Sequence, residues 1–404
     1  MFSTDLQIID YALLGALGFL FLAQFYFYVR YMCAPARKLR RDKKKNEKSV
    51  NAPGVSVILC AHNESENLSN YLQALLTQEY PEYEVIVVDD GSEDKTREVI
   101  ERYMVYDPRL HMTFVPAGAR IGSTKKLALT LAAKSARYDY LLLTDADCVP
   151  ESNHWIREMM KGFGEVQSAP SGQSKGTKDI VLGFSPYFKE KGLINRLVRF
   201  ETLFNGLHYL GAAICRHPYM GVGRNLAYKK SLFFESGGFT HMMNNRAGDD
   251  DLFVNHVATR KNTAVVVTPE SYSWSLSKTN LRDWWQQKRR HLSVSPNYRL
   301  GTKIRLGLEP LTRGLFYALV LGIILYQGIN NGPSSLIHCP LSIVLVAAAG
   351  LFLLRWIMMS LVLNISARRM GLNRFNPFSI LWFDIIIPII NLWMLLVPKR
   401  IKKW

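Results

Sequence analysis

Four long apolar runs at the two ends of the 404-residue chain restrict its fold more than any other feature. The first run, Ile8–Val29, is long enough to cross the hydrocarbon core of a bilayer as a helix. It has neither the basic start nor the small-residue cleavage site of a signal peptide, so we expect a retained anchor. The other three runs close the chain, at about Gly314–Gly328, Leu341–Leu363 and Phe378–Val397.

Positive charge gathers beside these runs. Of the formal net charge of +17, residues 30–50 carry +7, residues 368–374 carry +3 and residues 399–403 carry +4. Lysine and arginine are enriched in cytoplasmic loops, where they also meet anionic lipid. We therefore expect an integral protein of the inner membrane, with a cytoplasmic central domain and membrane lipid as a partner. A nucleic-acid partner is not expected, because the rest of the chain carries little excess charge.

The last apolar run conflicts with this charge rule. If it crosses the bilayer, the basic tail ends outside, whereas Asp384 and Pro388 within the run also allow a broken or re-entrant segment. We therefore expect two to three spans in the C-terminal region. The five cysteines are scattered and form no Cys-x-x-Cys pair, which disfavours a disulfide framework and a structural zinc site.

Short apolar runs alternate with amphipathic segments in the middle of the chain. Leu68, Leu72 and Leu75 have helical spacing, and Ser123 is a candidate cap for a helix that runs to Ala136. This alternation predicts an α/β fold with a mostly parallel sheet covered by helices on both faces. The predicted strands are Val55–Cys60, Glu84–Val88, His111–Val115 and Tyr140–Leu143.

These patterns divide the chain into four parts. They are an N-terminal transmembrane helix at 1–30, a basic cytoplasmic linker at 31–52, an α/β domain at 53–308 and a C-terminal membrane region at 309–404.

The α/β domain has no Gly-x-Gly-x-x-Gly pattern and no Walker A loop. Their absence disfavours a dinucleotide oxidoreductase and a P-loop ATPase.

Polar clusters follow three of the predicted strands, at His62–Glu64, Asp89–Ser92 and Asp145–Asp147. Ligands of open parallel sheets bind beyond the carboxyl ends of the strands, so we expect the clusters to form one site. Asp145 and Asp147 are two residues apart, and on an extended segment their side chains face the same way. Two such carboxylates repel each other unless a cation lies between them. A divalent cation that also holds a diphosphate is the natural candidate for this position. The alternative is that the two acids bind no ligand and only make the end of the strand polar, where it meets water.

Three motifs, Val55–Glu64, Val87–Ser92 and Thr144–Asp147, in this order and spacing, resemble the nucleotide-binding half of a family 2 glycosyltransferase. The resemblance covers about residues 53–295 and points to the membrane-anchored members of the cellulose and hyaluronan synthase-like superfamily. It implies the GT-A nucleotide-diphospho-sugar transferase fold, which is Rossmann-like with a mostly parallel sheet, flanked here by transmembrane helices. The implied reaction is inverting, metal-dependent transfer of a sugar from a nucleotide-sugar donor, such as a UDP-sugar, to a lipid-linked or saccharide acceptor.

The resemblance also implies roles for individual residues. Asp147 would contact a Mg²⁺ or Mn²⁺ ion most directly, with Asp145 as the second ligand. Lys125 and Lys126 follow a presumed helix start, where a lysine suits a phosphate, and the alternative for both is a solvated face. The first two polar clusters could also be simple turns. The expected nucleotide contacts are Asn63, Glu64, Asp89, Asp90, Lys125 and Asp145.

Three adjacent acids, at Asp249–Asp251, form the next candidate element. They could be an acid-rich helix start, because aspartate near a helix N-terminus is stabilised by the macrodipole. The family pattern at this place is Glu-Asp-x-Asp-Leu, and matching its end on Asp251-Leu252 puts Gly248 at the glutamate. The resemblance therefore implies that Asp249 is the general base, with Asp250 as its nearest rival.

The acceptor side is expected to involve two later segments. Asn225 lies in the glycine-bearing stretch 221–228, which the resemblance places at the acceptor wall. Residues 287–291 resemble the Gln-x-x-Arg-Trp motif of processive synthases, but with His291 in place of the tryptophan, for which Trp284 or Trp285 could substitute. A basic interfacial helix is the alternative. The expected acceptor contacts are Asn225, Trp284, Gln287, Arg290 and His291.

Two rival functions remain beside transfer of a single sugar. One is a processive polysaccharide synthase subunit, which the altered motif at His291 and the small number of apolar runs disfavour. The other is a non-catalytic membrane scaffold that keeps the fold, which the intact acidic clusters disfavour.

Overall fold

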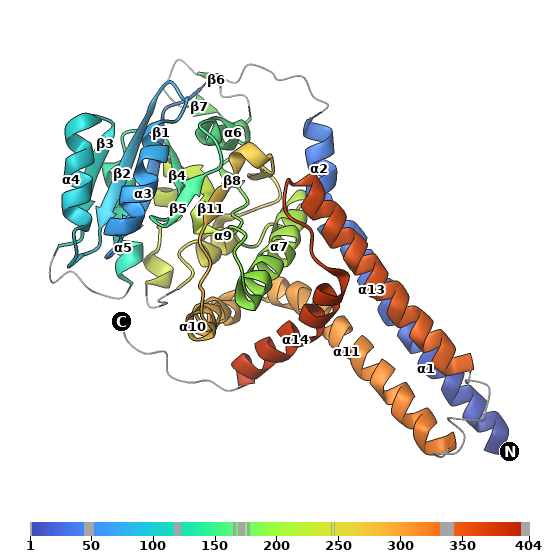
Figure 1. Ribbon diagram of the computed structural model, residues 1–404. Coiled ribbons are helices and arrows are strands. Elements are labelled where there is room, and N and C mark those ends of the chain that lie inside the picture. The colour runs from blue at the N-terminus through green and yellow to red at the C-terminus, as the bar shows by residue number, and fades with distance from the viewer. Residues whose placement is uncertain are drawn as a thin grey trace.

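The computed structural model describes residues 2–43, 52–116, 123–164, 167–168, 174–175, 178–243, 245, 247–331 and 343–396. A domain built around a sheet stands at one end of a rod of long helices (Figure 1). Within these described ranges, four helices are long and apolar enough to cross a membrane, which agrees with the four predicted runs. The basic tail at residues 399–403 lies outside the described residues.

The central sheet has seven strands in the order β10-β8-β9-β4-β1-β2-β3. The four predicted strands are confirmed, and β1 lies parallel between β2 and β4, with β3 parallel to β2 at the edge. Their bounds are β1 Val55–Ala61, β2 Tyr83–Asp89, β3 Leu110–Phe114 and β4 Tyr140–Leu143. The sheet is therefore mostly parallel, as predicted.

Three further strands complete the sheet and were missed by the sequence analysis. The strand β9 is antiparallel to both β4 and β8, whereas β10 is parallel to β8. Each has three or four residues, too few for a clear apolar pattern. Their bounds are β8 Ile180–Leu182, β9 Leu226–Lys229 and β10 Thr263–Val265.

The sheet separates two apolar cores, because successive side chains of a strand face opposite sides. Val57 and Leu59 of β1 pack in one core with Leu68 of α3, whereas Ile58 packs in the other with Leu129 of α5. Every residue of β2 is buried, which explains its continuous apolar run. The helices of these layers are α3 Ser65–Leu76, α4 Thr96–Tyr106, α5 Thr124–Ser135, α6 Trp155–Lys161 and α7 Leu193–Ile214.

Short elements join the sheet to the site. The strands β5 and β11 form an antiparallel pair beside the end of β4, and β6 pairs with β7. The remaining elements of the domain are β5 Cys148–Pro150, β6 Gln167–Ser168, β7 Ser174–Lys175, η2 Gly223–Asn225, α8 Lys230–Glu235, η3 Thr240–Met242, α9 Asp251–Val257, η4 Pro269–Ser271, β11 Ser273–Ser275, α10 Leu281–Leu292 and η5 Ser295–Asn297.

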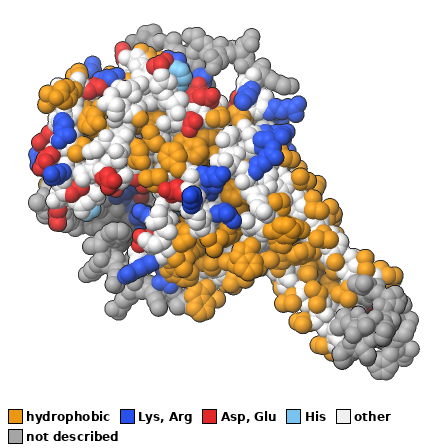
Figure 2. Space-filling view, in the orientation of Figure 1, with side chains coloured by type: hydrophobic (Ala, Val, Ile, Leu, Met, Phe, Trp, Pro, Cys, Tyr) orange, Lys and Arg blue, Asp and Glu red, His pale blue; other side chains and the backbone are white. Residues whose placement is uncertain are grey.

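Three helices run side by side in the rod, and their apolar side chains cover its surface (Figures 1 and 2). The helix α11 begins at Leu300, before the predicted run, because polar residues mask the apolar pattern of its first turns. A fourth helix, α14, leaves the rod and contacts α7 and α10 of the domain. The bounds are α1 Phe2–Phe27, η1 Tyr28–Met32, α2 Ala34–Asp42, α11 Leu300–Asn331, α13 Ile343–Arg369 and α14 Pro377–Leu396. The helix α14 continues through Asp384 and Pro388, so neither residue breaks it.

A buried ionic network ties α14 to the rod. Asp384 of α14 accepts hydrogen bonds from Arg313 of α11 at 2.8 Å and from Arg355 of α13 at 2.7 Å. Arg313 also donates to Glu309 at 3.0 Å, and all four side chains are at most 8% exposed. Because the two arginines are matched by two carboxylates, apolar helices can bury them without a net charge.

Candidate active site

The polar clusters meet at one edge of the sheet. Ala61 of β1 pairs with Asp89 of β2, so these two strands end at the same level. The parallel strand β4 ends earlier, where Leu143 pairs with Ile58, and its carboxyl end points to the same edge. Direct hydrogen bonds join the first two clusters, because Ser92 contacts both Asn63 and Asp89. The predicted gathering of the clusters at the carboxyl ends is confirmed.

The strand ends are shaped by their own side chains. Asn63 has a φ of +57°, and its side-chain oxygen accepts a hydrogen bond from the backbone of Glu93 at 2.8 Å. Asp89 is buried and accepts from the backbone of Ser92 at 2.9 Å, and Asp90 is half-buried beside it. Asn63 and Asp89 thus fix the backbone of the adjoining loop.

Glu64 faces the aspartate pair. Burial, and then the negative charges of Asp147 and Asp145, raise the pKa of Glu64 above its usual range. Its carboxylate accepts one hydrogen bond, from the amide of Asn67 at 2.5 Å. Glu64 is therefore close enough to the aspartate pair for the charges of both aspartates to act on its carboxylate.

Asp145 and Asp147 do not lie on an extended segment, so the predicted local geometry was wrong. The strand β4 ends at Leu143, and the chain then turns into β5, with the amide of Cys148 donating to the Asp145 carbonyl at 3.1 Å. The turn forms because β5 must reverse toward its antiparallel partner β11. The two aspartates are therefore related by a turn and not by strand alternation.

Lys125 links the aspartate pair to the distant acid cluster. Its ammonium lies 2.9 Å from Asp145 and 3.5 Å from Asp249. Burial alone would lower the pKa of Lys125, but the charges of these two acids hold it well above its usual range. Burial would likewise raise the pKa of Asp145, and Lys125 holds it below its usual range. Three segments far apart in sequence therefore meet at one ammonium group.

Lys126 has a different position from its neighbour. Its side chain is fully buried and donates to the backbone carbonyls of Asn245 and Ala247. Burial lowers the pKa of Lys126. The structure thus separates the two lysines, because Lys125 faces the acids while Lys126 holds the loop before them.

The acid cluster contains both a half-buried carboxylate that pairs with Lys125 and a helix cap. Asp250 caps α9, and its two oxygens accept from the backbones of Asp251 at 2.8 Å and Gly223 at 2.6 Å. Burial, and then the charge of Asp249, raise the pKa of Asp250 to about 6. Asp249 contacts Lys125 and makes no other hydrogen bond to the part of the chain that is described. The helix-start interpretation therefore fits Asp250, and Asp249 has the freer carboxylate.

Gly248 stands where the family pattern has glutamate, and its backbone explains the difference. Its φ is +82°, a conformation that side chains disfavour. A Cβ at this position would lie 2.8 Å from Leu252 Cγ. The loop before the acids is therefore built for glycine.

Arg224 was not among the expected site residues. Its guanidinium lies 4.3 Å from the centroid of the Tyr187 ring and donates to the Ser185 carbonyl at 3.3 Å. Its Nη1 atom is buried and has no hydrogen-bond partner within the described ranges. Burial would lower the pKa of Arg224, but Tyr187 and the acids at Asp147 and Asp145 raise it. A cation with a spare donor thus lies beside the aspartate pair.

Two expected acceptor residues are buried in the domain. Asn225 has no exposed surface, and its amide donates to the carbonyls of Phe184 at 2.8 Å and Ser271 at 2.7 Å. Its oxygen accepts from the Trp155 ring at 3.1 Å. Trp284 is 3% exposed and packs in the core. Neither placement supports an acceptor contact, because both side chains are enclosed by the domain itself.

The remaining candidates lie on α10. Gln287 donates to the hydroxyl of Tyr187 at 3.4 Å, and Tyr187 is the residue under Arg224. Arg290 and His291 are exposed, and Arg290 is one of the cations that lower the pKa of Asp145. This end of α10 therefore faces the site through Gln287 and Arg290.

We expect Asn225→Ala to destabilise the fold without a selective effect on acceptor use. The change leaves a ring N–H and two carbonyls without their partner, which costs about 3 kcal/mol in total. Thermal unfolding and the acceptor KM would be compared with Asn205→Ala, which removes an exposed asparagine on α7. An unchanged melting temperature with a raised acceptor KM would contradict this assignment.

The sequence itself matches a known family in this region. Residues 56–239 match the sequence profile of glycosyl transferase family 2. This part of the central domain therefore carries the sequence pattern of glycosyl transferase family 2. This agrees with the resemblance seen in the three strand-end motifs, which all lie in or at the border of the matched segment.

Polysaccharide synthases are among the similar proteins. A poly-beta-1,6-N-acetyl-D-glucosamine synthase of Staphylococcus epidermidis is 25% identical over 241 residues, which are 58% of this chain and 53% of the synthase. The synthase of the same name from Staphylococcus aureus strain COL is 23% identical over 250 residues, 61% of this chain and 56% of the synthase. The chain thus spans about half the length of these relatives.

The fold is also found in a solved transferase. A mannosyltransferase from Pyrobaculum calidifontis, in complex with GDP-Man and Mn²⁺, has a TM-score of 0.53 to this chain and 19% identity. The similarity covers 89% of this chain and 99% of the mannosyltransferase. It confirms the predicted GT-A fold of the domain.

Proposed function

We propose that this chain is an inverting, divalent-cation-dependent glycosyltransferase. It moves a sugar from a nucleotide-diphospho-sugar, for which a UDP-sugar is our candidate, to a lipid-linked or saccharide acceptor at the cytoplasmic face of the inner membrane. The observation that carries this proposal is the position of Lys125 between Asp145 and Asp249. It joins the end of β4 to the acid cluster in a domain of the GT-A fold.

The donor would bind along the carboxyl ends of β1, β2 and β4. Asp89 and Asp90, with Asn63 and Glu64, would contact the base and ribose, because carboxylate and amide oxygens accept from hydroxyl and amino groups. Lys125 and Arg224 would contact the diphosphate, which needs cationic donors in a partly buried site. The spare Nη1 donor of Arg224 supports its part in this contact.

The residues present fit a Mg²⁺ or Mn²⁺ ion. Asp145 and Asp147 offer hard carboxylate oxygens, and Asp145 already holds a cation in the form of Lys125. No group of three or more His, Cys, Asp and Glu suited to a metal occurs among the described residues. This donor set matches an ion that takes its other ligands from phosphate oxygens and water. When bound, such an ion would neutralise the charge that develops on the leaving diphosphate.

Asp249 would be the general base. Its carboxylate would take the proton from the acceptor hydroxyl as that oxygen bonds to the anomeric carbon. The bond from the anomeric carbon to the diphosphate breaks on the opposite face, so the configuration inverts and the diphosphate leaves with the bonding electrons. Lys125 contacts both Asp249 and Asp145, and it would hold the base beside the departing phosphate.

Processive polysaccharide synthesis is the second candidate, and the names of the Staphylococcus relatives favour it. His291 in place of the expected tryptophan and the burial of Trp284 speak for a single addition. A non-catalytic scaffold is disfavoured by the pairing of Lys125 with two separate acids. Product length would distinguish the first two functions.

A test of the proposed donor site is the affinity for UDP. We expect Lys125→Met and Arg224→Met each to weaken UDP binding roughly tenfold, because each removes a charged hydrogen bond to phosphate. Titration calorimetry in the presence of Mn²⁺ would measure the dissociation constants. Lys134→Met is the matched control, since Lys134 is exposed at the other end of α5. Unchanged affinity in both site variants would contradict the proposed donor site.

A further inference from the structure

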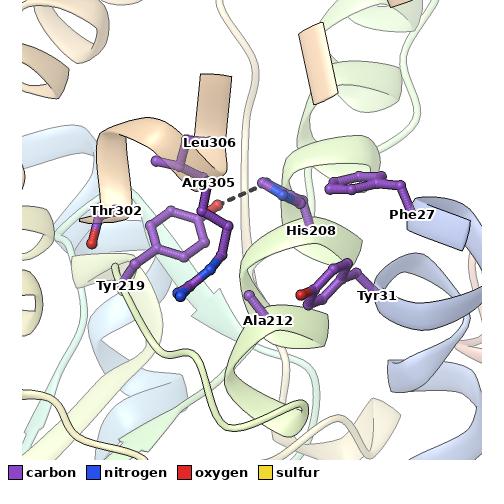
Figure 3. A pocket seen from close by; sticks show the side chains of 8 residues that line it. All are labelled: Phe27, Tyr31, His208, Ala212, Tyr219, Thr302, Arg305 and Leu306. Carbon is purple, nitrogen blue, oxygen red and sulfur yellow. Dashed lines mark hydrogen bonds between the residues drawn. The ribbon is translucent and has the colours of Figure 1, made fainter. Parts of the chain in front are cut away.

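A hollow lies where two candidate spans join the domain. It is formed by the end of α1 with η1, by α7, and by the first turns of α11 (Figure 3). Its empty volume of about 260 Å³ includes the open space at its mouth, so a ligand bound here would lie largely at the opening. The lining residues are Phe27, Tyr31, His208, Ala212, Tyr219, Thr302, Arg305 and Leu306.

The lining combines aromatic rings with a single cation. Tyr31 and Tyr219 have the amphipathic rings that are enriched where membrane meets water. His208 bonds to Tyr219 across 2.9 Å, and burial lowers the pKa of His208 to about 4, so its ring is neutral near pH 7. Arg305 is the one charged residue among the eight, and its guanidinium extends between Tyr219 and Ala212 (Figure 3).

The cation at the hollow is not neutralised by the protein. Arg305 makes no ion pair or side-chain hydrogen bond within the described part of the chain. Two more arginines, Arg30 and Arg260, lie close enough for their positive charges to affect the same histidine, His217, as Arg305 does. Burial, and then Arg305, Arg30 and Arg260, hold the pKa of His217 below its usual range. Uncompensated positive charge of this kind attracts an anion.

Exposed apolar surface flanks the hollow on both spans. Phe25 and Tyr26 of α1 are 45% and 60% exposed, and Ile304 and Leu308 of α11 are 59% and 53% exposed. Lysine and arginine gather where the domain meets the apolar rod (Figure 2). A ligand at this place would therefore meet cations at one end and apolar helix faces at the other.

We propose that the hollow binds the phosphate headgroup of an anionic membrane lipid, whose acyl chains lie along α1 and α11. Charge complementarity selects the anion, and the apolar flanks select a lipid over a free phosphate. The lipid would join α1, α7 and α11 at the level where the domain leaves the membrane. The proposal does not depend on the proposed transferase activity.

Native mass spectrometry of the full chain, released from nanodiscs, tests this site. Nanodiscs of phosphatidylcholine with a fraction of phosphatidylglycerol would supply the lipid, and retained phosphatidylglycerol would be counted for each variant. We expect Arg305→Ala to lower the retained fraction roughly fivefold. Lys303→Ala is the matched control, because it removes an exposed charge from the same helix outside the hollow. We expect it to have less than about half of that effect in free energy.

Equal losses in Arg305→Ala and Lys303→Ala would show general adsorption and would overturn the proposal. Unchanged retention in Arg305→Ala would overturn it as well. Displacement of the retained lipid by millimolar inorganic phosphate would show a free-phosphate site instead of a lipid site. Gel filtration and thermal unfolding of Arg305→Ala itself would show whether a loss of retention comes from misfolding. We expect Arg305→Lys, which keeps the charge, to retain more phosphatidylglycerol than Arg305→Ala.

Discussion

Asn in place of Asp249 is expected to lower the rate of sugar transfer by about 100-fold or more, because the acceptor hydroxyl loses its base. Donor binding should change little, because Lys125 still pairs with Asp145 when residue 249 is asparagine. Nucleotide release under donor saturation would measure the rate. The effect should therefore appear in kcat and not in the donor KM.

A control on the same sheet separates this effect from a general loss of structure. Asp139→Asn changes an exposed acid at the opposite end of β4, far along the strand from Asp145. We expect a rate close to that of the unchanged protein. A normal rate for Asp249→Asn, or an equal loss in Asp250→Asn with Asp249 intact, would assign the base to the capping residue instead.

Asp384→Asn is expected to destabilise the membrane region by about 3 kcal/mol or more, because two buried arginines lose their shared carboxylate. The change leaves Arg313 and Arg355 with Glu309 as the one remaining acid of the network. The free energy of unfolding in mixed micelles would measure the loss. It should be partly restored by Arg355→Gln in the same chain, since that double change removes the excess charge.

Asp10→Asn is the matched control for this network. Asp10 lies on α1 and accepts one hydrogen bond, from Gln327 at 3.0 Å. Because the control leaves no arginine unpaired, we expect a loss of about 1 kcal/mol or less. Equal losses in the two variants, or no restoration in the double variant, would mean that the ionic network does not stabilise the contact between α14 and the rod.

Much of the fold follows from local patterns. The strands β1, β2 and β4 are continuous apolar runs because both of their faces are buried, and such runs are visible in sequence. The strands β8, β9 and β10 have too few residues to show this pattern. The antiparallel partners of β4 and β8 were therefore not predictable from the sequence alone.

The site was predictable where residues follow strands and not where the tertiary fold decides. Asp89 and Asp145 lie at the expected edge because each follows a predicted strand. Burial of Asn225 depends on carbonyls from distant loops, and a motif does not reveal it. Arg224 belongs to no motif that marks it as a site residue. Its place beside the aspartate pair becomes visible only in the fold, where η2 positions it.

The measurement that tests the central claim most directly is nucleotide release by the full chain in nanodiscs. A panel of UDP- and GDP-linked sugars would be offered with Mn²⁺ and then with a chelator, in the presence of candidate lipid-linked and saccharide acceptors. We predict release from one donor, and loss of that release when the metal is removed. Absence of any nucleotide binding, with or without metal, would contradict the transferase account and leave the scaffold.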